Sequence, residues 1–310
     1  MCTALVVRSK NILFGRNMDI DYSFNEQVIF LPKNHLIRFK EEINIKSEYA
    51  ILGTGTIIDE YPMFADAMNE KGLAFAGLAF EDCCEYYKYK TNMKNLAPYE
   101  FVLYLLSLFS TVNEIKEELL KINIINIPIN EETKLANLHF IFTDKKESIV
   151  VETTSEGMKI YENKYDILTN NPPFSYHCYN ITNYMQLHNN KPYNNIANTL
   201  VLKPYSFNQG AIGLPGDYSS ASRFIKCFYL KSNLVLEGID KDYNEFFKCL
   251  DSVAMIKGAV KTNKGYEITR YTNCYDLEKS VLLYKTYDDP AFKKIKMNLS
   301  KNDCFCIKIQ

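Results

Sequence analysis

The chain has 310 residues, and its 36 basic and 37 acidic residues nearly cancel. Hydrophobic residues make up 47% of it and charged residues 24%, which excludes a disordered chain, a collagen and a small disulfide scaffold. Because there is no basic surplus, we expect neither nucleic acid nor a membrane as a partner. The chain is long enough to bury a large core, and we expect one domain over residues 1–310.

The N-terminus and the cysteines indicate a cytoplasmic protein. The first residues lack the basic and apolar regions of a secretory signal. The longest apolar stretch, Phe101 to Phe109, is too short to span a bilayer. The 9 cysteines are an odd number without a Cys-x-x-Cys pair, so no structural zinc site is indicated. We therefore expect reduced thiols in the cytoplasm.

Three pairs of short apolar runs flank polar turns, and each pair predicts an antiparallel hairpin. The late part of the chain adds two further strands, near 267–272 and 280–286. The predicted hairpins are Thr3–Val7 with Ile12–Arg16, Met63–Met68 with Leu73–Leu78, and Leu138–Thr143 with Ser148–Thr153.

Helices are predicted between these groups of strands. Pro98 suits the first turn of a helix that runs to Phe109, and a capping box at Thr111 opens a helix to about Ile122. Ser219 or Ser220 can cap a helix past Arg223, and a last helix spans 243–256. Hairpins alternating with helices favour an α+β fold with layered sheets over a doubly wound parallel sheet.

Cys2 is the first candidate for chemistry. A methionine before a small residue is usually removed, which leaves a thiol and a free α-amino group on the same residue. An α-amino group is a base near neutral pH and can activate the thiol beside it, so nucleophile and base are already together. The alternative is that a cysteine at position 2 is incidental.

Arg16 and Asp19 lie at the end of the second predicted strand, which the first hairpin places beside Cys2. They are three residues apart, so simple alternation puts them on opposite faces. Both can face one site only if the chain turns after Arg16. Arg16 would then favour the thiolate and Asp19 would orient the α-amino group. The alternative is a surface ion pair between them, which would contribute little.

Two later segments carry further polar candidates. Asn170 lies where a strand end runs into the turn Asn171-Pro172-Pro173, and a side-chain amide there can donate to an oxyanion. A plain Asn-Pro turn is the alternative. The glycine-rich loop 210–217 lacks the Lys-Ser/Thr of a phosphate-binding loop, and Arg223 lies one turn inside the helix that follows.

The ordered set of these segments resembles the choloylglycine hydrolase family of N-terminal nucleophile hydrolases, which includes conjugated bile acid hydrolases and penicillin V acylases. The resemblance covers nearly the whole chain, and each matching segment is weak alone. The segments are Met1-Cys2-Thr3, Phe14-Gly-Arg-Asn-Met-Asp19, Ala65-Asp-Ala-Met-Asn-Glu-Lys-Gly72, Leu168-Thr-Asn170, Gly213-Leu-Pro-Gly-Asp217 and Ala221-Ser-Arg-Phe224.

The resemblance implies an αββα sandwich, with two stacked antiparallel sheets between helix layers, often assembled as a homotetramer. It implies that Cys2 attacks an amide carbonyl after Met1 is lost, without a metal or an organic cofactor. Asp19 would bind the α-amino group and Asn170 would serve the oxyanion. Arg16 and Arg223 would surround the thiolate with positive charge.

One position departs from the family pattern. Ala79 stands where the bile acid branch usually has Asn and the penicillin V branch often has Tyr, so only its backbone N–H remains for the oxyanion. Loss of a side-chain donor of this kind can lower a rate by about 10²–10³ when nothing replaces it. The resemblance also implies a mostly apolar acyl pocket lined by Met18, Phe24, Ile58, Ala65, Ile129, Thr133 and Leu138.

The sequence therefore predicts a cytoplasmic amidohydrolase with an N-terminal cysteine nucleophile, acting on glycine- or taurine-conjugated bile acids. A penicillin V acylase with the same chemistry is the first alternative. A weakly catalytic protein that binds bile salts and lost efficient turnover at Ala79 is the second.

Overall fold

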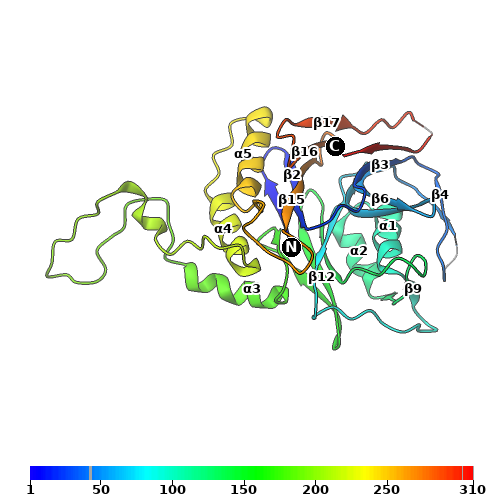
Figure 1. Cartoon of the computed structure of the whole chain (residues 1–310), viewed down its shortest axis with the longest axis horizontal. Helices are drawn as coiled ribbons and strands as arrows, with labels where there is room; N and C mark the ends of the chain where they lie inside the picture. Colours follow the sequence, from blue (N-terminus) through cyan, green and yellow to red (C-terminus); the bar gives the residue numbers. More distant parts are fainter. Residues whose placement is uncertain (42–43, 302, 310) are drawn as a thin grey trace.

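The computed structural model describes residues 1–41, 44–301 and 303–309. Two antiparallel sheets are stacked on each other, and helices cover the outer face of each (Figure 1). One sheet has six strands in the order β14-β1-β2-β15-β16-β17, and the other has eight in the order β13-β12-β11-β8-β7-β6-β3-β18. The expected αββα sandwich is confirmed.

The six-stranded sheet is built around the first predicted hairpin. That hairpin pairs Cys2 with Met18 and Ala4 with Arg16, so the N-terminal end of the first strand lies beside the far end of the second. The strands are β1 (Cys2–Arg8), β2 (Ile12–Ile20), β14 (Ile167–Leu168), β15 (Ile268–Asp276), β16 (Val281–Thr286) and β17 (Lys293–Lys296).

The eight-stranded sheet contains the other two predicted hairpins. Gly72, with φ of 89°, makes the turn between β7 and β8, a conformation that glycine adopts without steric cost. The strands are β3 (Gln27–Leu31), β6 (Ile51–Ile58), β7 (Tyr61–Asn69), β8 (Ala74–Ala79), β11 (Leu138–Thr143), β12 (Ser148–Thr154), β13 (Gly157–Glu162) and β18 (Phe305–Lys308). Two small pairs, β4 (Leu36–Ile37) with β5 (Ile45–Lys46) and β9 (Lys94–Leu96) with β10 (Ile122–Ile124), lie outside it.

The helices divide between the two outer faces. Helices α1 (Pro98–Leu108) and α2 (Val112–Leu119) lie on the side of the eight-stranded sheet, and α3 (Phe174–Asn180), α4 (Ser220–Ser232) and α5 (Ile239–Asp251) on the side of the six-stranded sheet. Two 3₁₀ turns, Ile181–Tyr184 and Phe207–Ala211, lie between α3 and α4. Among the described residues, no helix is long and apolar enough to cross a membrane.

Two predicted helix boundaries are wrong. The helix from Thr111 ends at Leu119, because Ile122 already begins β10 and pairs with β9. The helix predicted over 243–256 is α5, which begins earlier and ends at Asp251. The Asp242 carboxylate accepts from the N–H groups of Glu237 and Gly238 and so holds the earlier start. Beyond the other end, the Met255 N–H donates to the Thr269 hydroxyl and the Met255 carbonyl accepts from the Thr269 N–H, so the chain no longer follows the helix there.

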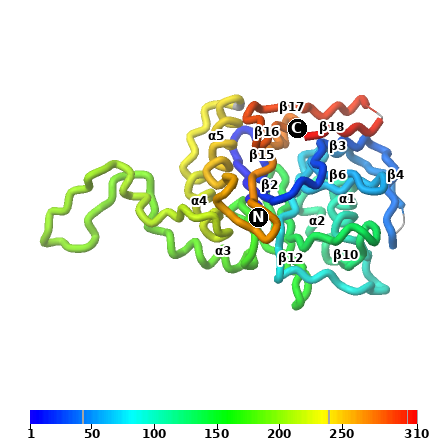
Figure 2. The backbone as a smooth tube through the Cα atoms, viewed as in Figure 1, coloured from blue at the N-terminus to red at the C-terminus, as the bar shows by residue number. Residues whose placement is uncertain are grey.

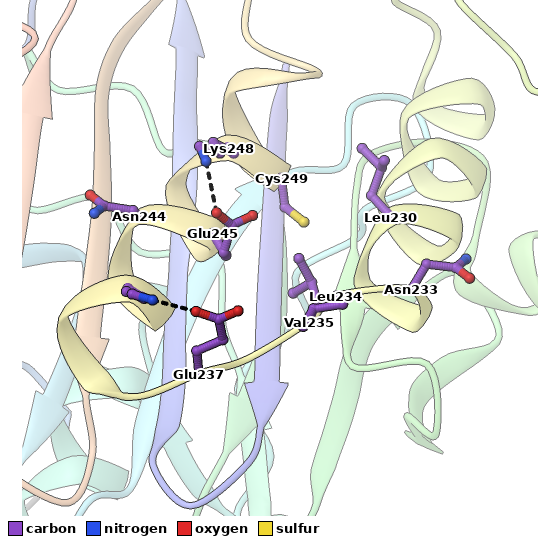
Figure 3. A pocket seen from close by; sticks show the side chains of 10 residues that line it. Leu230, Asn233, Leu234, Val235, Glu237, Asn244, Glu245, Lys248 and Cys249 are labelled. Atoms are coloured by element: carbon purple, nitrogen blue, oxygen red, sulfur yellow. Dashed lines mark hydrogen bonds and ion pairs between the residues drawn. The ribbon is translucent and has the colours of Figure 1, made fainter. Parts of the chain in front are cut away.

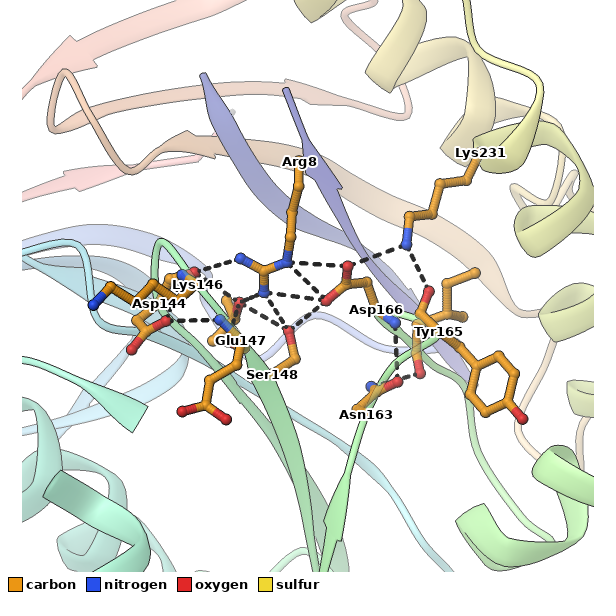
Figure 4. A network of polar contacts seen from close by, with 11 residues as sticks. Arg8, Asp144, Lys146, Glu147, Ser148, Asn163, Tyr165, Asp166 and Lys231 are labelled. Atoms are coloured by element: carbon orange, nitrogen blue, oxygen red, sulfur yellow. Dashed lines mark hydrogen bonds and ion pairs between the residues drawn. The ribbon is translucent and has the colours of Figure 1, made fainter. Parts of the chain in front are cut away.

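A partly buried polar network fastens β1 at the end opposite Cys2 (Figure 4). The Arg8 guanidinium donates to the Asp166 carboxylate at 3.1 Å and to the Ser148 hydroxyl at 2.8 Å. Lys231 of α4 donates to the same carboxylate at 3.2 Å. The network joins β1, β12 and α4, and so holds the two sheets and a helix in one arrangement.

The segment between α3 and α4 projects away from the body of the molecule (Figure 2). We call residues 185–214 the arm. Its apolar side chains lie largely in solvent, among them Met185, Tyr193, Ile196, Val201, Tyr205 and Phe207. An exposed apolar surface of this kind is typical of an interaction site.

Candidate active site

Cys2 is buried at the start of β1, with polar groups on both sides. Its sulfur accepts a hydrogen bond from Arg16 Nη2, and its backbone N–H donates to Asn170 Oδ1 at 2.6 Å. Met1 is present in this chain, and its α-ammonium donates to the Asp19 carbonyl at 2.7 Å and to the Glu267 carboxylate at 3.0 Å. In this state the Cys2 nitrogen is an amide and cannot act as a base.

Arg16 is fully buried between the two sheets. Its Nη1 donates to the Gly77 carbonyl of β8 at 2.6 Å, and its Nε lies 4.0 Å from the Asp66 carboxylate. Burial alone would lower the pKa of Arg16, but the charges of Cys2, Tyr271 and Asp66 raise it above its ordinary value. The guanidinium therefore stays charged beside the sulfur.

Asp66 balances that buried charge, and sequence reasoning gave it no role. It is fully buried in β7, and its carboxylate accepts from Tyr271 Oη at 2.7 Å, Tyr275 Oη at 2.6 Å and Asn273 Nδ2 at 2.6 Å. The surface ion pair between Arg16 and Asp19, considered as an alternative, is wrong. Both residues are buried, and the carboxylate beside Arg16 is that of Asp66.

Asp19 reaches the site from the other face of the sheet, without the turn after Arg16 that a site on one face would require. Strand β2 runs without interruption to Ile20, so Arg16 faces the eight-stranded sheet and Asp19 the helix side. Both lie near Cys2 because Cys2 is the first residue of β1, and a strand end is accessible from both faces. Simple alternation along β2 assumes a site on one face of the sheet, whereas the site lies at the end of strand β1, where residues from both faces meet.

The Asp19 carboxylate is buried with one oxygen unused. Its Oδ1 accepts from the Thr269 hydroxyl at 2.5 Å, while Oδ2 has no hydrogen-bond partner among the described residues. Burial raises the pKa of Asp19 above its ordinary value, although the Arg223 charge and the Thr269 hydroxyl act in the opposite direction. A buried carboxylate oxygen without a donor is unfavourable, so Oδ2 remains available to a cationic donor.

Arg223 lies on the helix side of the six-stranded sheet, in the first turn of α4. The helix begins after Ser219, whose hydroxyl accepts from the Ser222 N–H. The Arg223 guanidinium donates to the Cys2 carbonyl and, at 2.8 Å, to Asn170 Oδ1. Burial lowers the pKa of Arg223 below its ordinary value. Arg223 thus fixes both the backbone of the nucleophile and the orientation of the Asn170 amide.

Asn170 and Ala79 place backbone and amide donors on one side of Cys2. Asn170 Nδ2 donates to the Ala79 carbonyl at 2.7 Å. The Phe80 N–H donates to the Asn137 carbonyl, so by the alternation of an antiparallel ladder Ala79 directs its own N–H and C=O away from β11. The Ala79 N–H therefore points to the same side as the Asn170 amide.

The side chain at position 79 leaves the strand in a different direction. Ala79 pairs directly with Leu138, and a Cβ at Gly77 would contact Leu138 and Phe140, so residues 77 and 79 face the outer core against α1. A missing side chain at Ala79 therefore leaves the direction of the backbone N–H unchanged.

The predicted pocket residues fall into groups. Met18 and Ala65 touch Arg16, with Met18 Sδ 3.6 Å from Nη2 and the Ala65 carbonyl 3.4 Å from Nη1. Leu138 lies opposite Ala79, and Phe24 packs against the core that contains Cys2. A second group is a small apolar cluster away from the sulfur, and its members include Ile58, Ile129, Tyr99 and Leu135.

Thr133 lines a cavity of about 530 Å³ together with Leu135, which also belongs to the apolar cluster. None of the described hydrogen bonds joins Thr133 to the Cys2 group.

A larger groove of about 660 Å³ lies between α4 and α5 (Figure 3). Exposed ion pairs line it, including Lys248 with Glu245 at 2.7 Å. Its thiol is Cys249, and burial raises the pKa of Cys249 to about 12. A thiol that burial keeps protonated is a poor nucleophile, so this groove offers no support for thiol chemistry at Cys249.

Besides Asp66, sequence reasoning missed Thr269 and Glu267, which touch Asp19 and Met1. Both lie about 250 residues or more from their partners in the sequence, so no local pattern brings them together. Asp66 lies inside the segment Ala65–Gly72 that carried the resemblance, and an acid in a strand with apolar neighbours was the available signal.

Comparisons with a family model and with curated proteins match nearly the whole chain and agree with each other. The family model described as linear amide C–N hydrolases, choloylglycine hydrolase family, matches residues 2–310. The bile salt hydrolase/transferase of Lactiplantibacillus plantarum is 41% identical over 96% of this chain and 93% of its own.

Two solved structures share the fold. The C2A mutant of the conjugated bile acid hydrolase from Clostridium perfringens is 38% identical with a TM-score of 0.92, over 100% of this chain and 97% of its own. Penicillin V acylase from Agrobacterium tumefaciens is 20% identical with a TM-score of 0.75, over 96% of this chain and 86% of its own, and shows likeness of fold alone.

Proposed function

The chain belongs to the choloylglycine hydrolase family of linear amide C–N hydrolases, and we propose that it hydrolyses the amide bond of glycine- or taurine-conjugated bile acids. The observation that carries the proposal is the contact of the Cys2 sulfur with Arg16, at a strand start where the Cys2 N–H donates to Asn170 Oδ1. The relatives named for bile salts supply the substrate class.

Removal of Met1 creates the base. The Cys2 nitrogen becomes an α-amino group that keeps Asn170 Oδ1 as an acceptor, and the unused Asp19 Oδ2 becomes its counter-charge. The amine takes the thiol proton, and the resulting thiolate attacks the amide carbonyl. The resulting ammonium gives a proton to the departing amine of glycine or taurine. In the second step, the amine takes a proton from water as the water attacks the thioester, and it returns the proton to the departing Cys2 sulfur.

The oxyanion forms beside Ala79 and Asn170. In the proposed site, the Ala79 N–H and the second hydrogen of Asn170 Nδ2 donate to the carbonyl oxygen as it becomes negative. Arg16 supports the thiolate before attack, and Arg223 holds Asn170 in place. A backbone N–H is sufficient at position 79, which makes the loss of the family's Asn compatible with turnover.

The apolar side chains near the nucleophile suit a steroid acyl group. Met18 and Ala65 lie beside Arg16 at the reaction centre. Leu138, opposite Ala79, and the cluster containing Ile58 and Ile129 extend the apolar surface away from it. We assign Phe24 and Thr133 to the rim of this pocket. A penicillin V acylase would use the same catalytic groups on an aromatic acyl chain, and its supporting observation is the shared fold.

The wider organisation of the protein follows from the same proposal. The family model extends over residues 2–310, which supports a single domain. The exposed apolar side chains of the arm support a homotetramer in which arms of neighbouring copies bury one another. The 9 free thiols support a reducing, cytoplasmic location.

Parallel assays test the function. The purified chain, checked by mass for loss of Met1, is incubated with a glycine conjugate, a taurine conjugate and penicillin V, with Cys2→Ala as the control. We expect release of glycine or taurine at a kcat/KM at least tenfold above that for penicillin V. Faster penicillin V cleavage would favour the acylase. Binding of bile salt without turnover would favour the binding protein.

A further inference from the structure

A buried histidine–glutamate pair lies behind the two groups assigned to the oxyanion. The register that pairs Phe140 with Val151 places His139 of β11 opposite Glu152 of β12, and both side chains are fully buried. His139 Nδ1 lies 3.0 Å from Glu152 Oε1, and His139 Nε2 lies 2.9 Å from the Thr169 carbonyl oxygen.

The partners fix which ring nitrogen carries hydrogen. A carbonyl oxygen only accepts, so Nε2 of His139 must donate to Thr169. The remaining proton of the pair lies on Nδ1 or on Glu152, and both arrangements keep the Nε2–H. Glu152 Oε1 also accepts from the Phe174 N–H at 2.8 Å, so the carboxyl group is itself held in place. The carboxylate thus orients the ring, as it does for many functional histidines.

The same ring touches both sides of the oxyanion site. It stacks on Phe80 with centroids 4.4 Å apart and an angle of 7° between the planes. Phe80 follows Ala79 in the chain, and Thr169 precedes Asn170. The His139 ring therefore contacts Phe80, next to Ala79, and Thr169, next to Asn170.

We propose that His139, oriented by Glu152, is a positioning residue that sets the separation between the Ala79 N–H and the Asn170 amide. It touches no reacting atom and acts through Phe80 and Thr169. A misplacement of about 1 Å in such groups can lower a rate by about 10². His177 is the natural comparison, because its Nε2 donates to the Asn170 carbonyl at 3.0 Å while its ring stacks on Phe224 of α4 rather than on Phe80.

The test compares His139→Leu with His139→Gln, whose amide nitrogen can occupy the place of Nε2 and donate to Thr169. We expect His139→Leu to lower kcat on the conjugated bile acid by about 10- to 100-fold, with KM within about threefold. We expect the kcat of His139→Gln to be at least tenfold above that of His139→Leu. Phe80→Leu removes the stacking alone, so we expect it to lower kcat by less than His139→Leu does.

Alkylation of Cys2 by iodoacetamide separates positioning from general damage, because this reaction needs no oxyanion site. We expect alkylation rates close to wild type in all three variants. Equal kcat in His139→Gln and His139→Leu, an unchanged kcat in both, or a parallel fall in alkylation would overturn the proposal. If His139→Leu does not fold, His139→Gln and Phe80→Leu carry the same comparison.

The kinetic experiments rest on the proposed function. A spectroscopic experiment tests the positioning contact independently of the substrate. Nitrogen-15 NMR of the wild-type chain should show a slowly exchanging Nε2–H on His139, and Glu152→Gln should shift or broaden it. A bare Nε2 in the wild type would refute the positioning contact whatever the substrate. A wild type that cleaves no conjugated bile acid but shows this signal would remove the proposed function and leave the positioning geometry standing.

Discussion

Replacing Arg16 with glutamine removes a fully buried positive charge that lies between the Cys2 sulfur and the Asp66 carboxylate. At the 4.0 Å separation of Arg16 Nε and Asp66, the attraction is about 4 kcal/mol for an effective dielectric constant of about 20. The tyrosine and asparagine donors on Asp66 remain and offset part of this loss. We expect a fall of about 3 kcal/mol in the free energy of unfolding, at the low end for a broken buried pair.

The same substitution also removes the hydrogen bond to the sulfur. A hydrogen bond to a charged group contributes about 1.5–3 kcal/mol, so we expect turnover per folded molecule to fall by about 10- to 150-fold. Cys2 alkylation should slow in parallel, since both reactions need the thiolate.

Asp66→Asn is the matched control, because it removes the same ion pair and leaves the guanidinium at the sulfur. Thermal unfolding, turnover per folded molecule and the rate of Cys2 alkylation are measured for both variants. We expect similar losses of stability and a much smaller loss of turnover in Asp66→Asn. Wild-type turnover and alkylation in folded Arg16→Gln would refute the reasoning and leave Arg16 as the partner of Asp66 alone.

Three further outcomes are expected. Asp19→Asn should lower kcat at least tenfold without lowering the free energy of unfolding in denaturant, because burial already raises the pKa of this carboxyl and disfavours its charge. Ala79→Asn should change KM more than kcat, because the new side chain would leave the strand beside Leu138; a rise in kcat alone would contradict that placement. Hydrogen bonds from the Ser219 and Ser222 groups lower the pKa of Asp217 to about 2, so its stabilising effect is present above the unfolded value of about 3.9 and is lost as pH falls toward 2. Acid unfolding of wild type and Asp217→Asn should therefore differ at pH 5 and converge near pH 2.

The hairpins and the capped helices were predictable because their signals are local. The pairing of Cys2 with Met18 follows from one short turn, and Ser219 caps α4 through a residue three positions away. The end of α5 was not predictable in this way. The Met255 N–H donates to the Thr269 hydroxyl, and nothing near Met255 in the sequence indicates that partner.

The candidate site divides in the same manner. Cys2, Arg16, Asp19, Asn170 and Arg223 lie in segments that resemble a known family, and the structure brings all five together. Asp66 of β7 meets Arg16 only because the two sheets are stacked. Thr269 of β15 and Glu267 just before it reach Asp19 and Met1 because β15 pairs with β2, a pairing between segments about 250 residues apart. The strand end at Cys2 explains why alternation along β2 did not predict that Arg16 and Asp19 reach one residue.

The central claim is that the α-amino group of Cys2 is the base, and intact mass combined with turnover tests it most directly. Protein with and without Met1 is separated, each form is confirmed by mass, and the release of glycine or taurine is measured per molecule. We expect the form that begins at Cys2 to carry the activity and the form that retains Met1 to be inactive, because its Cys2 nitrogen is an amide. Full turnover by a chain that retains Met1 would contradict the account.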